Sequence, residues 1–245
     1  MTGDILTIVR KDLREMLLQG GTLRRSMRSL LIMFVVFGVV IPVKAGPALV
    51  EEPFAILPFV ALALLLTSSM VADGIAGERE RHTLETLLAS RLSDRAILIG
   101  KIVAAIVYGC SFMFVGALAG LVVVNLAHAG EGILVYSPQA LAILAGFGVL
   151  GAGLVASGGS LVALRAPTVR QAVQNMNLAI IVLIFAPVFV LRALPEEVRA
   201  QLASTLAGLD WPTIAVGLAI VIALLDLVLL AAAAARFQRT RLILD

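Results

Sequence analysis

The stretch that decides the fold covers residues 78–101 and reads ERERHTLETLLASRLSDRAILIGK. It is dense in charges of both signs, and it separates two long apolar blocks, residues 54–72 and 102–127, that are nearly free of charge. A short charged segment between two such blocks is typical of a structured loop at a membrane surface.

This segment has an internal pattern. Leu84, Leu87 and Leu88 fall on one helical face with charged residues around the others, which predicts a short amphipathic helix with a small apolar ridge. Ser93 and Asp94 then predict an N-cap and a first helical residue, where the next apolar helix begins.

The same residues resemble a known family. The pattern ERExxTLExLLxSxLS, followed by Gly100 and Lys101, is similar to the cytoplasmic coupling segment of type-2 ABC exporter permeases. The resemblance implies that the segment, residues 73–96, lies between the second and third membrane helices and docks on an ATPase subunit. Family members often have Pro where this chain has Arg91, so the turn before Ser93 departs from the family pattern.

The resemblance also implies which residues couple the chain to the ATPase. Carboxylates at a protein contact pair with basic side chains or backbone amides of the partner, and the leucines supply an apolar anchor. The predicted coupling residues are Glu78, Arg79, Glu80, Arg81, Thr83, Leu84, Glu85, Leu87 and Leu88. The alternative is a solvated charged loop without a partner.

Composition places the rest of the chain in a membrane. Hydrophobic residues make up 60% and charged residues 14% of the 245 residues, against roughly 45–50% and 25% in soluble domains. The apolar residues occur in blocks, and a chain of this length is too short to bury helices that are apolar on all sides. We therefore expect an all-α integral membrane protein that forms a single transmembrane domain, residues 1–245.

The order of the blocks predicts six membrane helices. The predicted spans are residues 29–43, 54–72, 102–127, 141–164, 176–191 and 213–235. Residues 1–28 are expected to form an amphipathic elbow helix and a basic anchor, and residues 192–212 a short interfacial helix on the outer side. Both features are also implied by the family resemblance.

The basic residues set the orientation. Six spans with both termini in the cytoplasm place 16 of the 19 Lys and Arg residues on the cytoplasmic side, and only Lys44, Arg192 and Arg199 outside. This asymmetry follows the positive-inside rule and would be inverted by a change of one span. It also puts residues 78–101 in the cytoplasm, where a docking segment has to lie.

The sequence contains no recognisable catalytic set. His82 and His128 fall on opposite sides of the predicted membrane, which excludes a histidine metal site within one chain, and Cys110 lies alone in an apolar block. No phosphate-binding loop surrounds Gly100 and Lys101. We expect neither a metal nor a cofactor in this chain, and ATP and Mg²⁺ on a separate ATPase.

Polar residues inside the predicted spans are candidates for the transport pathway or an interface. Asp226 lies within the sixth span, where an acid costs about 2.5–3.5 kcal/mol on insertion scales, so it should face another helix, a cavity or a dimer interface. A structural hydrogen bond is the favoured interpretation and a substrate- or ion-linked role the alternative; Asn125 is similarly ambiguous. Gly116 and Gly120 form a small-xxx-small pattern, which favours close helix packing.

The leading hypothesis is the permease subunit of an ATP-driven exporter. The resemblance implies a homo- or heterodimer in a prokaryotic plasma membrane, cytoplasmic ABC ATPase subunits as partners, no bound nucleic acid, and a lipid, drug, ion or haem-pathway substrate. Two alternatives are an ion-coupled secondary transporter that uses Asp226, and a membrane assembly factor that transports nothing.

Overall fold

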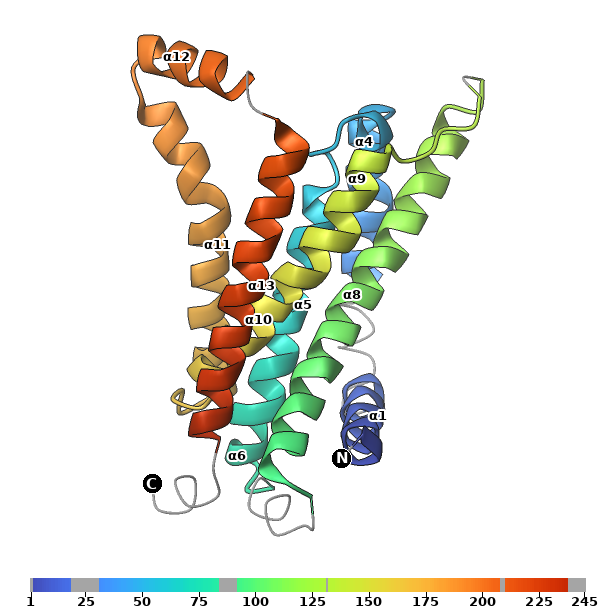
Figure 1. Cartoon of the computed structure of the whole chain (residues 1–245). Coiled ribbons are helices and arrows are strands. Elements are labelled where there is room, and N and C mark those ends of the chain that lie inside the picture. Colours follow the sequence, from blue (N-terminus) through green and yellow to red (C-terminus); the bar gives the residue numbers. More distant parts are fainter. Residues whose placement is uncertain (1, 19–30, 84–91, 131, 208–209, 238–245) are drawn as a thin grey trace.

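The computed structural model is a bundle of long helices (Figure 1), and it describes residues 2–18, 31–83, 92–130, 132–207 and 210–237. All regular secondary structure in these ranges is helical. The helical elements are, in chain order, α1 (Thr2–Leu18), η1 (Val36–Val40), α3 (Ile41–Ala45), α4 (Ala48–Glu51), α5 (Leu57–Ala72), η2 (Asp73–Gly77), α6 (Glu78–Glu80), α8 (Asp94–Ala127), α9 (Pro138–Ala142), η3 (Ile143–Phe147), α10 (Gly148–Ala163), α11 (Val169–Ala193), α12 (Glu196–Ala207) and α13 (Trp211–Arg236).

Four of the described helices are long and apolar enough to cross a membrane. They are Leu57–Glu80, Asp94–Ala127, Pro138–Ala163 and Pro212–Arg236, each longer than the roughly 20 residues that a bilayer core requires. Leu31–Ala45 is a shorter apolar helix, and α11 is 25 residues long. These helices make the chain a multi-pass membrane protein; the count of six spans stays a prediction.

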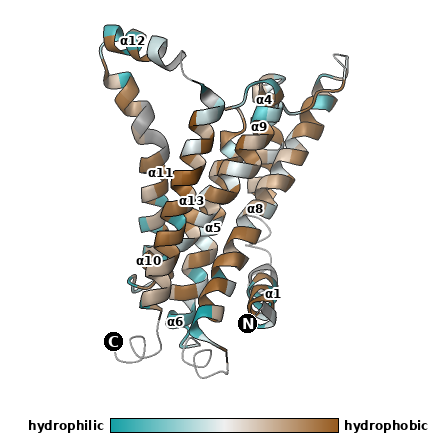
Figure 2. Cartoon of the chain, viewed as in Figure 1, coloured by the Kyte–Doolittle hydropathy of each residue, from teal (hydrophilic) through white to brown (hydrophobic). Residues whose placement is uncertain are grey.

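The outer surface of the bundle is apolar. Hydrophilic residues gather at its two ends, and apolar residues cover the helices between them (Figure 2). Leu118 of α8 is 62% exposed and Val228 of α13 is 64% exposed. Large apolar side chains exposed in such number need an apolar surrounding, which a lipid bilayer or a partner helix provides.

Close packing of α5 on α8 depends on two glycines of α8. A Cβ on Gly116 would lie 3.3 Å from Phe59, and a Cβ on Gly120 would lie 3.0 Å from both Phe59 and Pro42. Phe59 of α5 is fully buried in this contact. The predicted packing role of the Gly116–Gly120 pair is confirmed.

Helices α10 and α13 are joined by the one acid of the predicted sixth span. Ser157 Oγ donates a hydrogen bond to Asp226 Oδ1 at 2.6 Å, and Gly153 leaves the space that the Asp226 carboxylate occupies. The prediction that Asp226 faces another helix is confirmed. Asn125 holds the loop after α8: its amide donates to Leu134 O at 2.9 Å and accepts from Leu134 N at 2.8 Å.

Two predicted helix ends behave differently. Helix α8 begins at Asp94, and its N-cap residue Ser93 accepts a hydrogen bond from Ala96 N, as the sequence predicts. The second span, by contrast, does not end at residue 72. The helix continues through the π-helical turn η2 and ends with Glu80, so the start of the charged segment extends the membrane helix.

The elements predicted at the two surfaces are helices. Within residues 1–28, where the sequence predicts an amphipathic helix and an anchor, the structure has α1; residues 192–212 contain α12. Val198 and Leu202 of α12 are 44% and 36% exposed. Whether α12 dips into the bilayer stays a prediction, as does the role of α1 as an elbow.

Candidate functional site: the junction of α1, α6 and α8

The N-terminal helix α1 packs against α8 (Figure 1). The closest approach involves Gly100 of α8. A Cβ at position 100 would lie 2.8 Å from both Cβ and Cγ2 of Ile8, and 3.4 Å from the carbonyl oxygen of Ile5. Only a residue without a side chain lets the two helices approach this closely. Gly100 thus fixes the distance at which Lys101, the next residue, faces α1.

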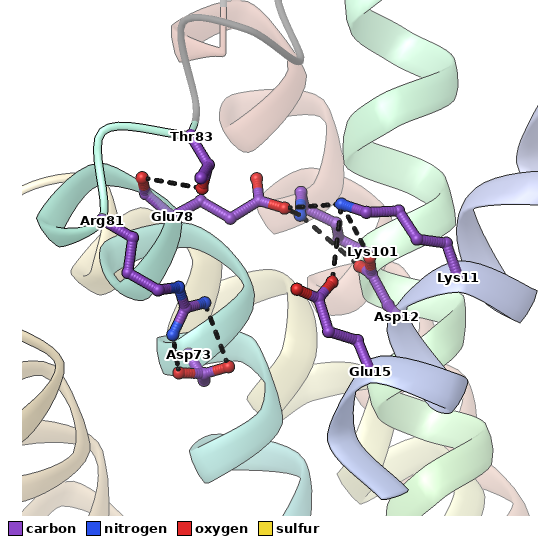
Figure 3. Close-up of polar contacts among 8 residues, drawn as sticks. All are labelled: Lys11, Asp12, Glu15, Asp73, Glu78, Arg81, Thr83 and Lys101. Carbon is purple, nitrogen blue, oxygen red and sulfur yellow. Dashed lines mark hydrogen bonds and ion pairs between the residues drawn. The ribbon is translucent and has the colours of Figure 1, made fainter. Parts of the chain in front are cut away.

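Lys101 is the centre of a buried ion cluster (Figure 3). Its Nζ lies 2.9 Å from Glu78 Oε1 and 3.4 Å from Asp12 Oδ2. Lys11 Nζ reaches the same Glu78 Oε1 at 3.1 Å and Glu15 at 3.6 Å. We call these five residues the junction, because they tie α1, α6 and α8 together.

Most of the junction is withdrawn from solvent. The side chains of Lys101, Glu78 and Asp12 are 3%, 6% and 8% exposed, whereas Lys11 is 47% exposed. Burial raises the pKa of Asp12, and the attraction of Lys101 and Lys11 only partly offsets it. Burial lowers the pKa of Lys11, but Glu78 and the other two acids raise it by more. A buried, paired lysine cannot be removed without leaving acids uncompensated.

One atom of the junction lacks a partner. Glu78 Oε2 is buried and makes no hydrogen bond within the described residues. Glu78 also lines a hollow of about 20 Å³ together with Asp12, Asp73 and Arg81. This is enough space for a single water molecule, which needs about 10–15 Å³ and two or more polar partners. The second carboxylate oxygen is therefore near a place where water can solvate it.

The helix that carries Glu78 ends in a Schellman motif. Thr83 N donates to Glu78 O at 2.9 Å and His82 N donates to Arg79 O at 3.0 Å, the bond pair that closes such a motif. His82 occupies the left-handed position with φ 54°, which glycine adopts more easily. The chain therefore turns sharply after α6 at a defined point.

A second ion pair braces the π-helical turn before α6. Arg81 donates to both carboxylate oxygens of Asp73, at 3.0 and 3.4 Å, and the hydrogen bond to Asp73 raises the pKa of Arg81. A Cβ on Gly77 would lie 2.7 Å from Asp73 Oδ1 and 3.1 Å from the Arg81 guanidinium. Gly77 thus makes room for the Asp73–Arg81 ion pair, which the sequence does not predict.

Arg79 points away from the junction and toward the end of α10. Its guanidinium donates to the carbonyl oxygens of Leu164 at 3.0 Å, Ala163 at 3.4 Å and Ala166. The last carbonyls of a helix have no partner within the helix, and a cation there also offsets the negative end of the helix dipole. Arg79 therefore attaches α6 to α10.

The structure separates the predicted coupling residues into two groups. Glu78 is buried and Arg79 is partly buried, and both bind other helices of this chain. Glu80, Arg81 and Thr83 are exposed at the end of α6. The remaining predicted coupling residues, Leu84, Glu85, Leu87 and Leu88, lie outside the described residues.

The partners of Glu78 were not predicted from the sequence. The sequence assigns Lys101, Lys11, Asp12 and Glu15 no contact with Glu78. One signal was available: Asp12 is four residues after Ile8, so an acid lies on the face of α1 that packs inward. The junction holds neither a nucleophile with a base nor a set of metal ligands within the described residues. Because the junction joins α1, α6 and α8, it can transmit a displacement of one of these helices to the other two.

Comparison with known proteins gives one family. The family model described as "ABC-2 type transporter" matches residues 4–196, more than three quarters of the chain. This range runs from the first turn of α1 to the end of α11 and includes all residues of the junction. No curated protein matches the chain.

Proposed function

The chain belongs to the ABC-2 type transporter family, and on this premise we propose that it is the permease subunit of an exporter driven by separate ATPase subunits. A component of this family is a membrane transport protein and not itself a catalyst. In the proposal, ATP and Mg²⁺ bind to the partner ATPase, and this chain supplies the path through the membrane.

The proposed topology has six spans in a prokaryotic plasma membrane, with both termini in the cytoplasm. Leu31–Ala45 and α11 would be the first and fifth spans, in addition to the four helices of sufficient length and hydrophobicity. The distribution of the 19 basic residues supports this orientation. It places α1, α6 and the start of α8 at the cytoplasmic end, and α12 at the outer end, as an interfacial helix.

The observation that carries the coupling proposal is the opposite placement of Glu78 and Glu80. Glu78 is held inside by Lys101 and Lys11, while Glu80 is exposed two residues later at the end of the same membrane helix. We therefore assign direct ATPase contact to Glu80, Arg81 and Thr83. The adjoining Leu84, Glu85, Leu87 and Leu88 would complete the docking surface. Glu78 and Arg79 would position that surface and receive its displacement.

A second protomer would complete the transport path. Much of the apolar surface of α13 is exposed within this chain: Val216, Leu227 and Val228 are 61%, 62% and 64% exposed. This exposed side of α13 is free to contact lipid or another permease copy. We propose a homo- or heterodimer with substrate passing between the protomers, gated by closure of the ATPases. Asp226 and Asn125 make hydrogen bonds within the chain, so any role in the path would add to a structural one.

The test is reconstitution of the chain with candidate ABC ATPase subunits from the same organism. We expect a stable complex whose ATP hydrolysis is stimulated by the permease, and a loss of about tenfold or more of that stimulation in Glu80→Lys, since a reversed charge at a contact costs more than 1.4 kcal/mol. Glu197→Lys reverses an exposed acid on α12, at the other end of the bundle, and serves as the matched control.

Two results would reject the proposal. One is a chain that forms no complex with any ABC ATPase yet drives transport from an ion gradient and loses it in Asp226→Asn, which would identify a secondary transporter. The other is equal stimulation in Glu80→Lys and Glu197→Lys, which would remove the docking role of α6.

A further inference from the structure

A hollow of about 270 Å³ lies between the end of α10 and the start of α11. Leu161 and Val162 line it from the last turn of α10, Arg165 from the connection, and Gln171 and Asn175 from the first turns of α11. A single water needs only about 10–15 Å³, so the hollow can hold a much larger group. It is separate from the junction, which lies on the other side of α6.

The polar lining of this hollow favours an anion. Arg165 is exposed, and its guanidinium makes no hydrogen bond or ion pair within the described residues. Residues 165–174 contain Arg165 and Arg170 and no acid. Gln171 and Asn175 add amide donors.

The backbone around the hollow adds to the positive potential. The carbonyl oxygens at the end of α10, including that of the lining residue Ala166, are already bound by Arg79. Their negative charge is therefore offset. The N-terminal end of α11, with Thr168 as its N-cap, meets the hollow from the other side, and a helix N-terminus carries a partial positive charge.

The apolar lining and the depth point to lipid. The membrane-compatible helix Pro138–Ala163 ends two residues before Arg165. The proposed topology therefore places the guanidinium near the level of the headgroup phosphates. Leu161 and Val162 are partly exposed, and they give the hollow an apolar part of its lining. Basic pockets between membrane helices on the cytoplasmic side are typical binding sites for anionic headgroups.

We propose that this hollow binds the phosphate of an anionic phospholipid, with Arg165 as the countercharge, Gln171 and Asn175 as donors, and Leu161 and Val162 against the glycerol and the first acyl carbons. The site goes beyond the transport role. It needs the membrane placement of the chain, but neither an ATPase nor a substrate. The lipid site can therefore be disproved while the proposed transport function holds, and the transport function can be disproved while the lipid site holds.

The first test compares two arginines of the same connection. The full-length chain is purified with mixed phosphatidylglycerol and phosphatidylcholine, and the retained lipids are counted by native mass spectrometry. We expect preferential retention of phosphatidylglycerol, reduced about fivefold in Arg165→Gln, which matches the loss of one basic contact near a membrane surface. Arg170→Gln removes the same charge from a residue that does not line the hollow, and should keep the preference. Equal loss in both variants, or loss in neither, would overturn the proposal.

The second test leaves Arg165 in place, in case its substitution prevents folding. Gln171→Glu puts a carboxylate into the hollow, while Gln174→Glu puts one on an exposed residue of the same helix outside it. Only Gln171→Glu should abolish the rise in melting temperature that added phosphatidylglycerol produces. If inorganic phosphate at equal phosphate concentration gave the same rise, the ligand would be a free anion and the lipid proposal would be wrong. An equal effect of the two glutamates would also refute it.

Discussion

Replacing Lys101 by Met should strongly destabilise the protein. Lys101 Nζ lies 2.9 Å from Glu78 and 3.4 Å from Asp12, and its side chain is 3% exposed. Methionine fills a similar volume but removes the charge, so the change isolates the electrostatic contribution from packing. The five residues of the junction carry two positive and three negative charges, a net charge of −1. The variant removes one positive charge and makes the net charge −2.

The expected loss follows from the burial. Breaking a buried ion pair by removing one partner costs about 3–5 kcal/mol, because the other charge stays in a poorly solvated place. Lys11 contacts the same Glu78 oxygen at 3.1 Å but is 47% exposed. An exposed pair contributes about 0.2–1 kcal/mol. Lys11→Met should therefore cost far less than Lys101→Met, although both change the net charge equally.

The assay is thermal unfolding of the purified chain in detergent. A loss of about 3–5 kcal/mol corresponds to a fall of about 6–20 °C in Tm, since 1 kcal/mol shifts Tm by about 2–4 °C for domains of this size. The double variant Glu78→Gln/Lys101→Met restores a net charge of −1 in the junction and should recover a large part of the loss, with a coupling energy of at least about 1 kcal/mol. Similar Tm values for Lys101→Met and Lys11→Met, or no recovery in the double variant, would refute the account of the junction.

Three further predictions concern single residues around the junction. Gly100→Ala should cost about 1–3 kcal/mol because its Cβ would lie 2.8 Å from two atoms of Ile8; the companion change Ile8→Ala should reduce the loss of Tm, and an unchanged loss would argue against this contact. His82→Gly should raise stability by about 1 kcal/mol because φ is 54° at this position, whereas His82→Val should lower it, and denaturation of both variants checks the sign. Because burial raises the pKa of Asp12, the native state holds this proton more tightly than the unfolded chain does. As the pH falls toward about 4, the Tm of the wild type should therefore rise relative to that of Asp12→Asn, and a gap independent of pH would contradict it.

Local sequence signals predicted the elements of this fold, and they failed where a contact joins distant parts of the chain. Ser93 correctly predicted the start of α8, because a capping side chain acts within one helical turn. The spacing of Gly116 and Gly120 correctly predicted close packing, because residues four positions apart lie on one face of α8. The Lys101–Asp12 pair spans 89 residues, and no local pattern in either segment identifies its partner.

The helix of the second span continues past the predicted boundary at residue 72. The sequence places Asp73 at the start of the charged segment, residues 73–96. In the structure its carboxylate is paired with Arg81, which lies eight residues later, at the position that directly follows α6. Such a pairing lets charged residues extend the helix past its apolar run, and the pair depends on the space at Gly77, which hydropathy does not report.

The three residues Glu78, Arg79 and Glu80 have different partners because they are consecutive in a helix. Successive residues of an α-helix point about 100° apart, so three consecutive side chains face three directions. Glu78 faces α1 and α8, Arg79 faces α10, and Glu80 is exposed. In an extended loop, a push on the exposed residue would be absorbed by backbone rotation. Here the three residues belong to a continuous helix that begins at Leu57, so a displacement at Glu80 must move Glu78 and Arg79 with it. Within the proposed function, this is how one docking contact would reach three membrane-associated helices at once.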